Sequence, residues 1–113
     1  LMLAELLRAE RAAAELPPAW ALAMVRAEAQ QPPVAQRFLA RVAGMIGDGS
    51  IRVAGPLPAL LQRRAGHWRY QLWLMTPDRG RLQRVLAELQ PLVQELPEAQ
   101  KVRWHIDVDP LEL

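Results

Sequence analysis

Two hydrophobic periodicities alternate along this chain, and their order limits the folds that it can adopt. Apolar residues recur at every second position over 67–76, which is the period of a β-strand, and at every third or fourth position over 34–46, which is the period of a helix. Clusters of Gly and Pro separate such segments. The predicted elements are strand 20–28, helix 34–46, strand 51–54, strand 67–76, helix 77–96 and strand 101–109.

The order strand, helix, strand, strand, helix, strand is a split βαβ repeat. It predicts an α+β fold, a βαββαβ two-layer sandwich in which a four-stranded antiparallel sheet carries two helices on one face. A further helix is expected over 1–15, because this segment is rich in Leu and Ala and Pro17-Pro18 ends it. We therefore expect a helical lead-in at 1–19 and one folded domain at 20–113. Since the chain begins inside a helix without an initiator Met, we expect it to be part of a longer protein.

Glycine and proline positions set the expected boundaries of these elements. Residues 47–49 (Gly-Asp-Gly) should close the first helix with a left-handed cap. Residues 55–58 (Gly-Pro-Leu-Pro) should form a stiff turn, and a basic connection should follow over 60–66. Pro77 suits the start of the second helix, whereas Pro91 should kink or restart it.

Alternation in the strand 67–76 separates its side chains into two sets. Trp68, Tyr70, Leu72 and Leu74 should face the helices and the core, whereas Trp73 should point to the open face of the sheet. Met24 and Met75 are expected beside Trp73 there. Such an apolar patch is either a platform on which nucleic-acid bases stack or an interface for another protein. We favour docking, because Trp73 is the one outward aromatic residue.

The charge distribution is uneven. Residues 51–84 contain seven Arg and one Asp, a net charge of +6, whereas 1–50 sum to zero and 85–113 sum to −4. A basic block of this kind suits a polyanion such as nucleic acid. A solvated, arginine-rich surface would give the same composition.

Within the basic block, residues 63–69 (Arg-Arg-Ala-Gly-His-Trp-Arg) are the best candidate for a DNA contact, because guanidinium groups hold phosphates bidentately and stack on bases. The expected DNA-binding residues are Arg52, Arg63, Arg64, His67 and Arg69. Arginines at a helix start are unfavourable for the helix dipole, so Arg79, Arg81 and Arg84 indicate either an anion to be bound there or a solvated helix face.

Catalytic, cofactor and metal sites are not expected. The chain has no Cys, its one Ser is Ser50, and its histidines, His67 and His105, lack a neighbouring nucleophile. There is no Walker-type phosphate loop. Asp107 and Asp109 are too few ligands for a good cation site. No apolar run reaches the length of a membrane span, and no signal peptide is recognisable, so we expect a cytoplasmic protein.

Four stretches together resemble a known family. They are 16–20 (L-P-P-A-W), 53–59 (V-A-G-P-L-P-A), 63–72 (R-R-A-G-H-W-R-Y-Q-L) and 101–110 (K-V-R-W-H-I-D-V-D-P). They are similar to the C-terminal domains of the PriA family, the bacterial replication-restart DNA helicases also known as primosomal protein N-prime. The likeness covers essentially the whole chain, and the last two motifs are specific. One departure is His67, where many relatives carry Arg.

The resemblance implies a compact domain with a fold like that of a small ribosomal protein. It implies binding to forked and single-stranded DNA, and contacts with the helicase core, with single-stranded DNA-binding protein and with other primosome proteins. By this analogy Trp73, Arg79 and Arg81 bind partners, and Arg79 or Arg81 meets the acidic tail of single-stranded DNA-binding protein. The family's ATP-dependent 3′–5′ helicase motifs, with ATP, Mg²⁺ and zinc, lie upstream, so this chain should not be an enzyme.

Two functions follow from these residues and this resemblance. The first is a DNA-binding and docking domain of a replication-restart primosome protein, nucleoid-associated in the cytoplasm, in which the arginines contact phosphates without reading sequence. The alternative is a protein-interaction domain that packs on the helicase core and on single-stranded DNA-binding protein without binding DNA itself.

Overall fold

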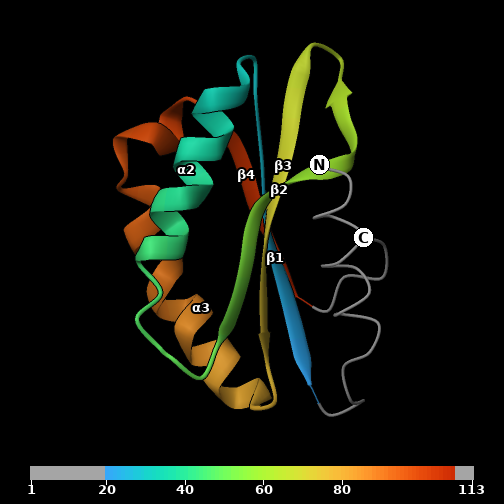
Figure 1. Cartoon of the computed structure of the whole chain (residues 1–113). Helices are drawn as coiled ribbons and strands as arrows, with labels where there is room; N and C mark the ends of the chain where they lie inside the picture. The colour runs from blue at the N-terminus through green and yellow to red at the C-terminus, as the bar shows by residue number, and fades with distance from the viewer. Residues whose placement is uncertain (1–19, 109–113) are drawn as a thin grey trace.

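The computed structural model describes residues 20–108, which fold into two layers (Figure 1). One layer is a four-stranded sheet in the order β2-β3-β1-β4, and the other consists of two helices. The elements are β1 (Ala21–Ala29), α2 (Pro32–Gly44), β2 (Arg52–Arg64), β3 (His67–Thr76), α3 (Arg79–Gln94), the 3₁₀ helix η1 (Pro97–Gln100) and β4 (Arg103–Val108). The helix expected over 1–15, and with it the lead-in at 1–19, lies outside the described residues.

All three pairs of neighbouring strands are antiparallel, with β1 and β3 in the middle. Both helices lie on the same side of the sheet (Figure 1). The α+β class, the antiparallel sheet and the pair of helices on it are therefore confirmed. No helix within 20–108 is long and apolar enough to cross a membrane.

The larger core lies between the sheet and the helices. The helix-facing side of β1 is almost entirely alanine, which lets α2 approach closely and place Phe38 and Leu39 against the sheet with no exposed surface. From β3 the predicted residues Tyr70, Leu72 and Leu74 enter this core, and Trp68 packs at its margin. The alternation predicted for this strand is confirmed, because side chains in a strand change faces at every residue.

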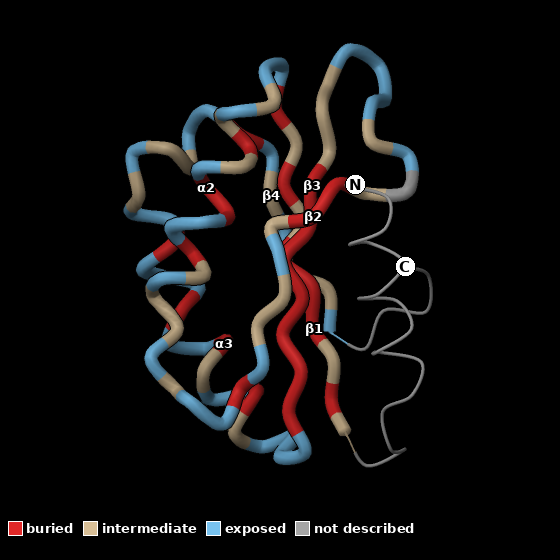
Figure 2. Tube along the Cα trace, in the orientation of Figure 1, coloured by how far each residue is buried: buried red, intermediate tan, exposed pale blue. Residues whose placement is uncertain are grey.

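The open face of the sheet carries a second apolar cluster. Met24, Leu57, Trp73 and Met75 are all buried there, with Trp20 packed against them. Figure 2 shows the two central strands buried along most of their length, which requires apolar contact on both faces of the sheet. The outward direction predicted for Trp73 is correct, but the side chain has no exposed surface.

The second strand is much longer than predicted. The segment expected to form a short strand, a stiff turn and a basic connection is one edge strand, β2, of 13 residues. Its pairing with β3 is irregular, with register shifts between Ala54 and Leu57 and between Pro58 and Arg63, so it runs as separate paired segments. Proline is tolerated on an edge strand, because its missing N–H would point away from the sheet.

The backbone of the β2–β3 hairpin is irregular at two places, and each of them contains a glycine with positive φ. Gly55 has φ of +117° and precedes a cis peptide bond to Pro56, at the first register shift. At the tip, Ala65 (φ 51°) and Gly66 (φ 81°) form a two-residue turn in which both residues are left-handed. That conformation matches the twist of the flanking strands, so β2 and β3 form a long projecting hairpin (Figure 1).

The helix boundaries also differ from the predicted ones. Helix α2 begins at Pro32, because proline suits the first helical positions, and its C-cap Met45 is right-handed with φ of −83°. The predicted left-handed cap at 47–49 is therefore wrong. Helix α3 begins after Asp78, whose side chain accepts a hydrogen bond from the backbone N–H of Arg81, and it continues through the exposed Pro91 without a restart.

Candidate nucleic-acid interface

The tip of the β2–β3 hairpin brings together four of the residues singled out by sequence. Arg63 pairs with Trp68 and Arg64 pairs with His67 across the hairpin, so the two arginines point to opposite faces. Both arginines are exposed, and no carboxylate within 20–108 forms an ion pair with either. The tip is therefore a small, unneutralised cationic surface.

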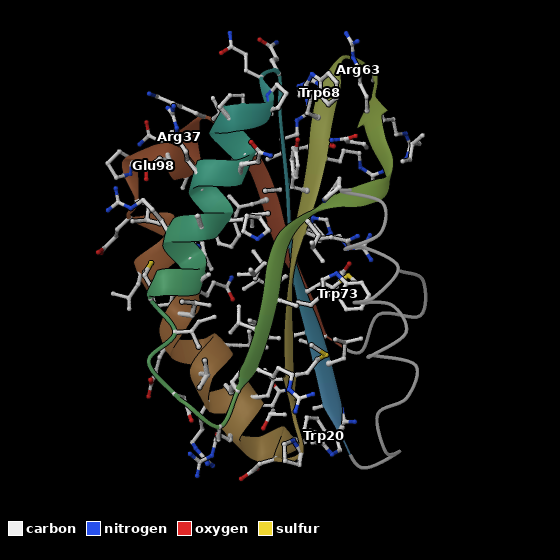
Figure 3. The ribbon with its side chains drawn as sticks, in the orientation of Figure 1. Trp20, Arg37, Arg63, Trp68, Trp73 and Glu98 are labelled. Carbon is white, nitrogen blue, oxygen red and sulfur yellow. The ribbon has the colours of Figure 1, made fainter. Side chains whose placement is uncertain are left out.

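Arg63 is held in place by an aromatic ring. Its guanidinium carbon lies 5.3 Å from the ring centroid of Trp68, within the range of a cation–π contact, and Figure 3 shows the pair at the end of the hairpin. Trp68 in turn packs at the margin of the main core. The contact therefore links an exposed cation to the rigid part of the molecule, which lowers the entropy lost when the side chain binds a ligand.

Arg69 lies on the open face of the sheet, two residues along β3 from His67. Its Nε lies 3.8 Å from Oε2 of Glu28, and its Nη1 donates a hydrogen bond of 3.4 Å to the carbonyl oxygen of Leu61. Arg69 is close to the tip, but its charge is shared with a carboxylate.

Arg52 is separated from the other candidate residues. It pairs with Met75 at the opposite end of β3, and its guanidinium carbon lies 5.5 Å from the ring centroid of Trp20. Figure 3 places Trp20 and the labelled pair Arg63 and Trp68 at opposite ends of the sheet. The structure does not bring Arg52 into the cationic cluster at the hairpin tip.

The three residues expected to bind partners differ in their exposure and in their contacts. Trp73 is fully buried, and its Nε1 has no hydrogen-bond partner within 20–108, so it is not an exposed anchor. The exposed Arg79 lies in the first turn of α3. Arg81 is engaged inside the domain, since its Nη1 lies 3.2 Å from Oδ2 of Asp48 and its Nε lies 3.7 Å from Oδ2 of Asp78.

Asp48 is a structural residue that the sequence did not single out. Its Oδ1 accepts hydrogen bonds from the backbone N–H of Ser50 at 2.9 Å and from the Ser50 hydroxyl at 2.7 Å. These bonds, followed by the hydrogen bond and charge of Arg81, hold the pKa of the Asp48 carboxyl below its usual range. Asp48 therefore joins the loop before β2 to the start of α3.

Sequence reasoning also missed a polar cluster on the open face of the sheet. Alternation in β4 places Arg103, His105 and Asp107 on one face, but only the register shows that they lie across β1 from β3. Arg26 Nε lies 2.7 Å from Oδ2 of Asp107, and His105 Nε2 lies 3.4 Å from the same oxygen. Asp107 is thus paired with basic residues, and no group of three or more potential metal ligands exists within 20–108.

The geometry defines a class of protein: a split βαβ sandwich with a projecting basic hairpin. A designed protein, Foldit4, has the same fold, with a TM-score of 0.60 over 80% of this chain and 97% of its own; at 11% identity this likeness concerns the fold alone. The family model of the primosomal protein N C-terminal domain matches residues 12–111. The chain is 36% identical over 101 residues to the replication restart protein PriA of Haemophilus influenzae.

The chain belongs to the family of primosomal protein N C-terminal domains. The alignment with the Haemophilus protein covers 87% of this chain but only 14% of that relative's length. The chain thus spans only a small part of that relative.

Proposed function

We propose that this chain is the C-terminal module of a PriA-type replication restart protein and that it binds forked or single-stranded DNA through the tip of its β2–β3 hairpin. The observation that carries the proposal is the pair of exposed arginines, Arg63 and Arg64, which have no carboxylate partner within the described residues. Phosphates would meet them without first displacing an internal anion.

Recognition at this tip would depend on charge and shape. Guanidinium groups bind phosphate oxygens bidentately, and phosphate contacts carry no sequence information. His67 is at the same tip, with its Nδ1 3.2 Å from the carbonyl oxygen of Ala65, and would lie beside the bound phosphates. Arg52 is too distant to take part in the same contact, so the expected site is smaller than the one inferred from sequence.

The domain's other roles in this proposal concern the parent protein. ATP hydrolysis, Mg²⁺ and zinc would belong to upstream regions, and this module would itself carry no catalysis. It would pack on the helicase core and contact single-stranded DNA-binding protein and other primosome proteins in the cytoplasm. Arg79, exposed in the first turn of α3, and Arg81, paired with two aspartates, are the candidate contacts for an acidic partner.

A second candidate function is protein interaction without DNA binding. The observation that favours it is Leu61, which is 55% exposed on the same hairpin. An exposed leucine beside arginines suits a partner that is both apolar and acidic. Leu61→Ala should weaken such a partner and leave DNA binding unchanged.

The proposal is tested by fluorescence anisotropy with a forked and a single-stranded oligonucleotide over a series of salt concentrations. Replacing both Arg63 and Arg64 with alanine should weaken binding to every sequence alike. The log–log salt slope on single strands should also become shallower by about 1.4, since each lost phosphate contact contributes about 0.7. The matched control replaces Arg37 and Arg84, two exposed arginines on the helices, and should change the slope little.

Two results would contradict the proposal. One is the absence of binding by the wild-type chain at low salt, which would favour the protein-interaction function. The other is an equal loss of affinity in the tip variant and the helix variant, since that would reflect net charge alone and not a site at the hairpin.

A further inference from the structure

The polar part of the open sheet face is organised around one carboxylate. Glu28 lies in β1, directly opposite Arg69 in β3 and Arg103 in β4. Its Oε2 lies 3.8 Å from Arg69 Nε, and its Oε1 lies 3.7 Å from Arg103 Nη1. Both separations exceed the length of a good charge-assisted hydrogen bond, which is about 2.7–2.9 Å. Glu28 therefore offsets the charge of two arginines without using up their donors.

A small pocket of about 100 Å³ opens at this place. Its polar and charged lining comes from Arg26, Glu28, Arg69, Gln71, Arg103 and His105. Gln71 is only 1% exposed, and its Nε2 has no hydrogen-bond partner within 20–108. A buried N–H without an acceptor is unfavourable, so a ligand that brings an oxygen acceptor into the pocket gains an interaction that the domain itself does not provide.

The pocket selects for an oxyanion by its charges and its donors. Of its three arginines, Arg26 is paired with Asp107, so Arg69 and Arg103 face the single carboxylate of Glu28, and the buried amide of Gln71 adds a neutral donor. A phosphodiester presents two non-bridging oxygens, as a carboxylate does, so it can replace Glu28 between Arg69 and Arg103. Since Arg69 follows His67 on the same face of β3, this place is also reached directly from the hairpin tip.

We infer that the Gln71 pocket is a second phosphate site for the strand bound at the hairpin, and that Glu28 is its built-in competitor. The inference rests on the proposed function, because the phosphate belongs to the DNA that the tip holds. The carboxylate of Glu28 must move away from Arg69 and Arg103 before the phosphodiester binds them. The wild-type affinity is therefore held below what these arginines would support alone.

Removing the competitor should strengthen binding. Glu28→Gln in the full 113-residue chain should bind a single-stranded oligonucleotide about five-fold more tightly at low salt, and its log–log salt slope should steepen by about 0.7, as expected for one added phosphate contact. The control is Glu88→Gln, which removes one negative charge from the exposed surface of α3. Thermal unfolding of both variants should show that each remains folded.

Two further variants locate the effect. Adding Arg69→Ala and Arg103→Ala to Glu28→Gln should abolish the gain, because no cations remain for the phosphate. Adding Gln71→Met, which keeps the length of the side chain but removes its donors, should reduce the gain. In the wild-type chain, the side-chain amide resonances of Gln71 should shift when the oligonucleotide is added.

The outcomes separate this inference from the proposed function. If the hairpin-tip variant loses DNA affinity while Glu28→Gln and Glu88→Gln both bind as wild type does, the hairpin binds DNA and the second site is refuted. Equal gains for Glu28→Gln and Glu88→Gln refute it as well, since net charge would explain them. If no variant binds any oligonucleotide at low salt, the proposed function fails and the inference fails with it.

Discussion

At the scale of single residues, the irregular edge strand depends on Gly55. Its φ of +117° lies in the region that side chains rarely adopt. A Cβ at this position would lie 2.9 Å from the carbonyl oxygen of Gln71 and 3.0 Å from the backbone nitrogen of Leu57. Because both neighbours are backbone atoms of a paired strand, they cannot move aside without breaking the ladder.

We therefore expect Gly55→Ala to lower the free energy of unfolding by about 2–3 kcal/mol, from backbone strain and steric overlap together. Urea denaturation measures this. The control is Gly47→Ala, where a Cβ would meet no atom within 4 Å. Gly47→Ala should be neutral or slightly stabilising. Similar stabilities for the two variants would show that the backbone at Gly55 rearranges at little expense.

At the scale of elements, the loop before β2 and the start of α3 are held together by one carboxylate. Asp48 accepts hydrogen bonds from Ser50 and pairs with Arg81, whose own backbone N–H caps α3 through Asp78. Arg81 therefore stabilises the fold. We expect the position of the first turn of α3 to depend on the ionised form of Asp48.

This arrangement makes stability depend on pH. Since the pKa of Asp48 is lowered in the folded state, its contribution is fully present above the unfolded value of about 3.9 and is lost as the pH falls through the folded value. Asp48→Asn should melt at a lower temperature than wild type at pH 7, and the difference should shrink below about pH 4. A difference that stays constant down to pH 2 would contradict this role.

The sequence predicted the elements well where the side-chain period was clean. The ten residues of β3 and the alternation of β4 are specified by alternating large apolar residues, so their existence and faces follow directly. It failed for β2, because Gly55, Pro56 and Pro58 are typical turn residues. Pairing with β3 overrides that local preference, and a long-range pairing of this kind is not visible in local composition.

At the scale of the whole molecule, each face of the sheet carries a buried apolar cluster. The rest of the open face is polar. Phe38 anchors the core under the helices, and Trp73 anchors the cluster on the open face; both are fully buried. The two clusters contact opposite sides of the same central strands. Stability should therefore depend on both.

Trp73→Ala should accordingly lower the free energy of unfolding by about 3–5 kcal/mol, as for other large buried aromatic residues, and should match Phe38→Ala within that range. The control is Leu92→Ala on α3, where the side chain is 51% exposed and the change should stay within about 0.5 kcal/mol. Chemical denaturation followed by circular dichroism provides the values. A loss below about 1 kcal/mol for Trp73→Ala would show that the open-face cluster is not part of the cooperative core.

The candidate site was predicted in part. Residues 63–69 are contiguous, so their gathering at one hairpin tip was accessible from sequence once the turn was recognised. The separation of Arg52 from the hairpin tip could not be predicted from the sequence, since it depends on the length of β2. The arrangement of Glu28 between Arg69 and Arg103 joins three strands distant in sequence, and it requires the register of the assembled sheet.

The opposite directions of Arg63 and Arg64 have a geometric consequence. A flat surface approaching the hairpin from one side reaches only one of the two guanidinium groups. Both are engaged together only by a ligand that wraps around the tip or straddles it. In the proposed function, a single strand would curl around the tip and the two arms of a fork would straddle it, so the hairpin would respond to the shape of the phosphate backbone and not to the bases.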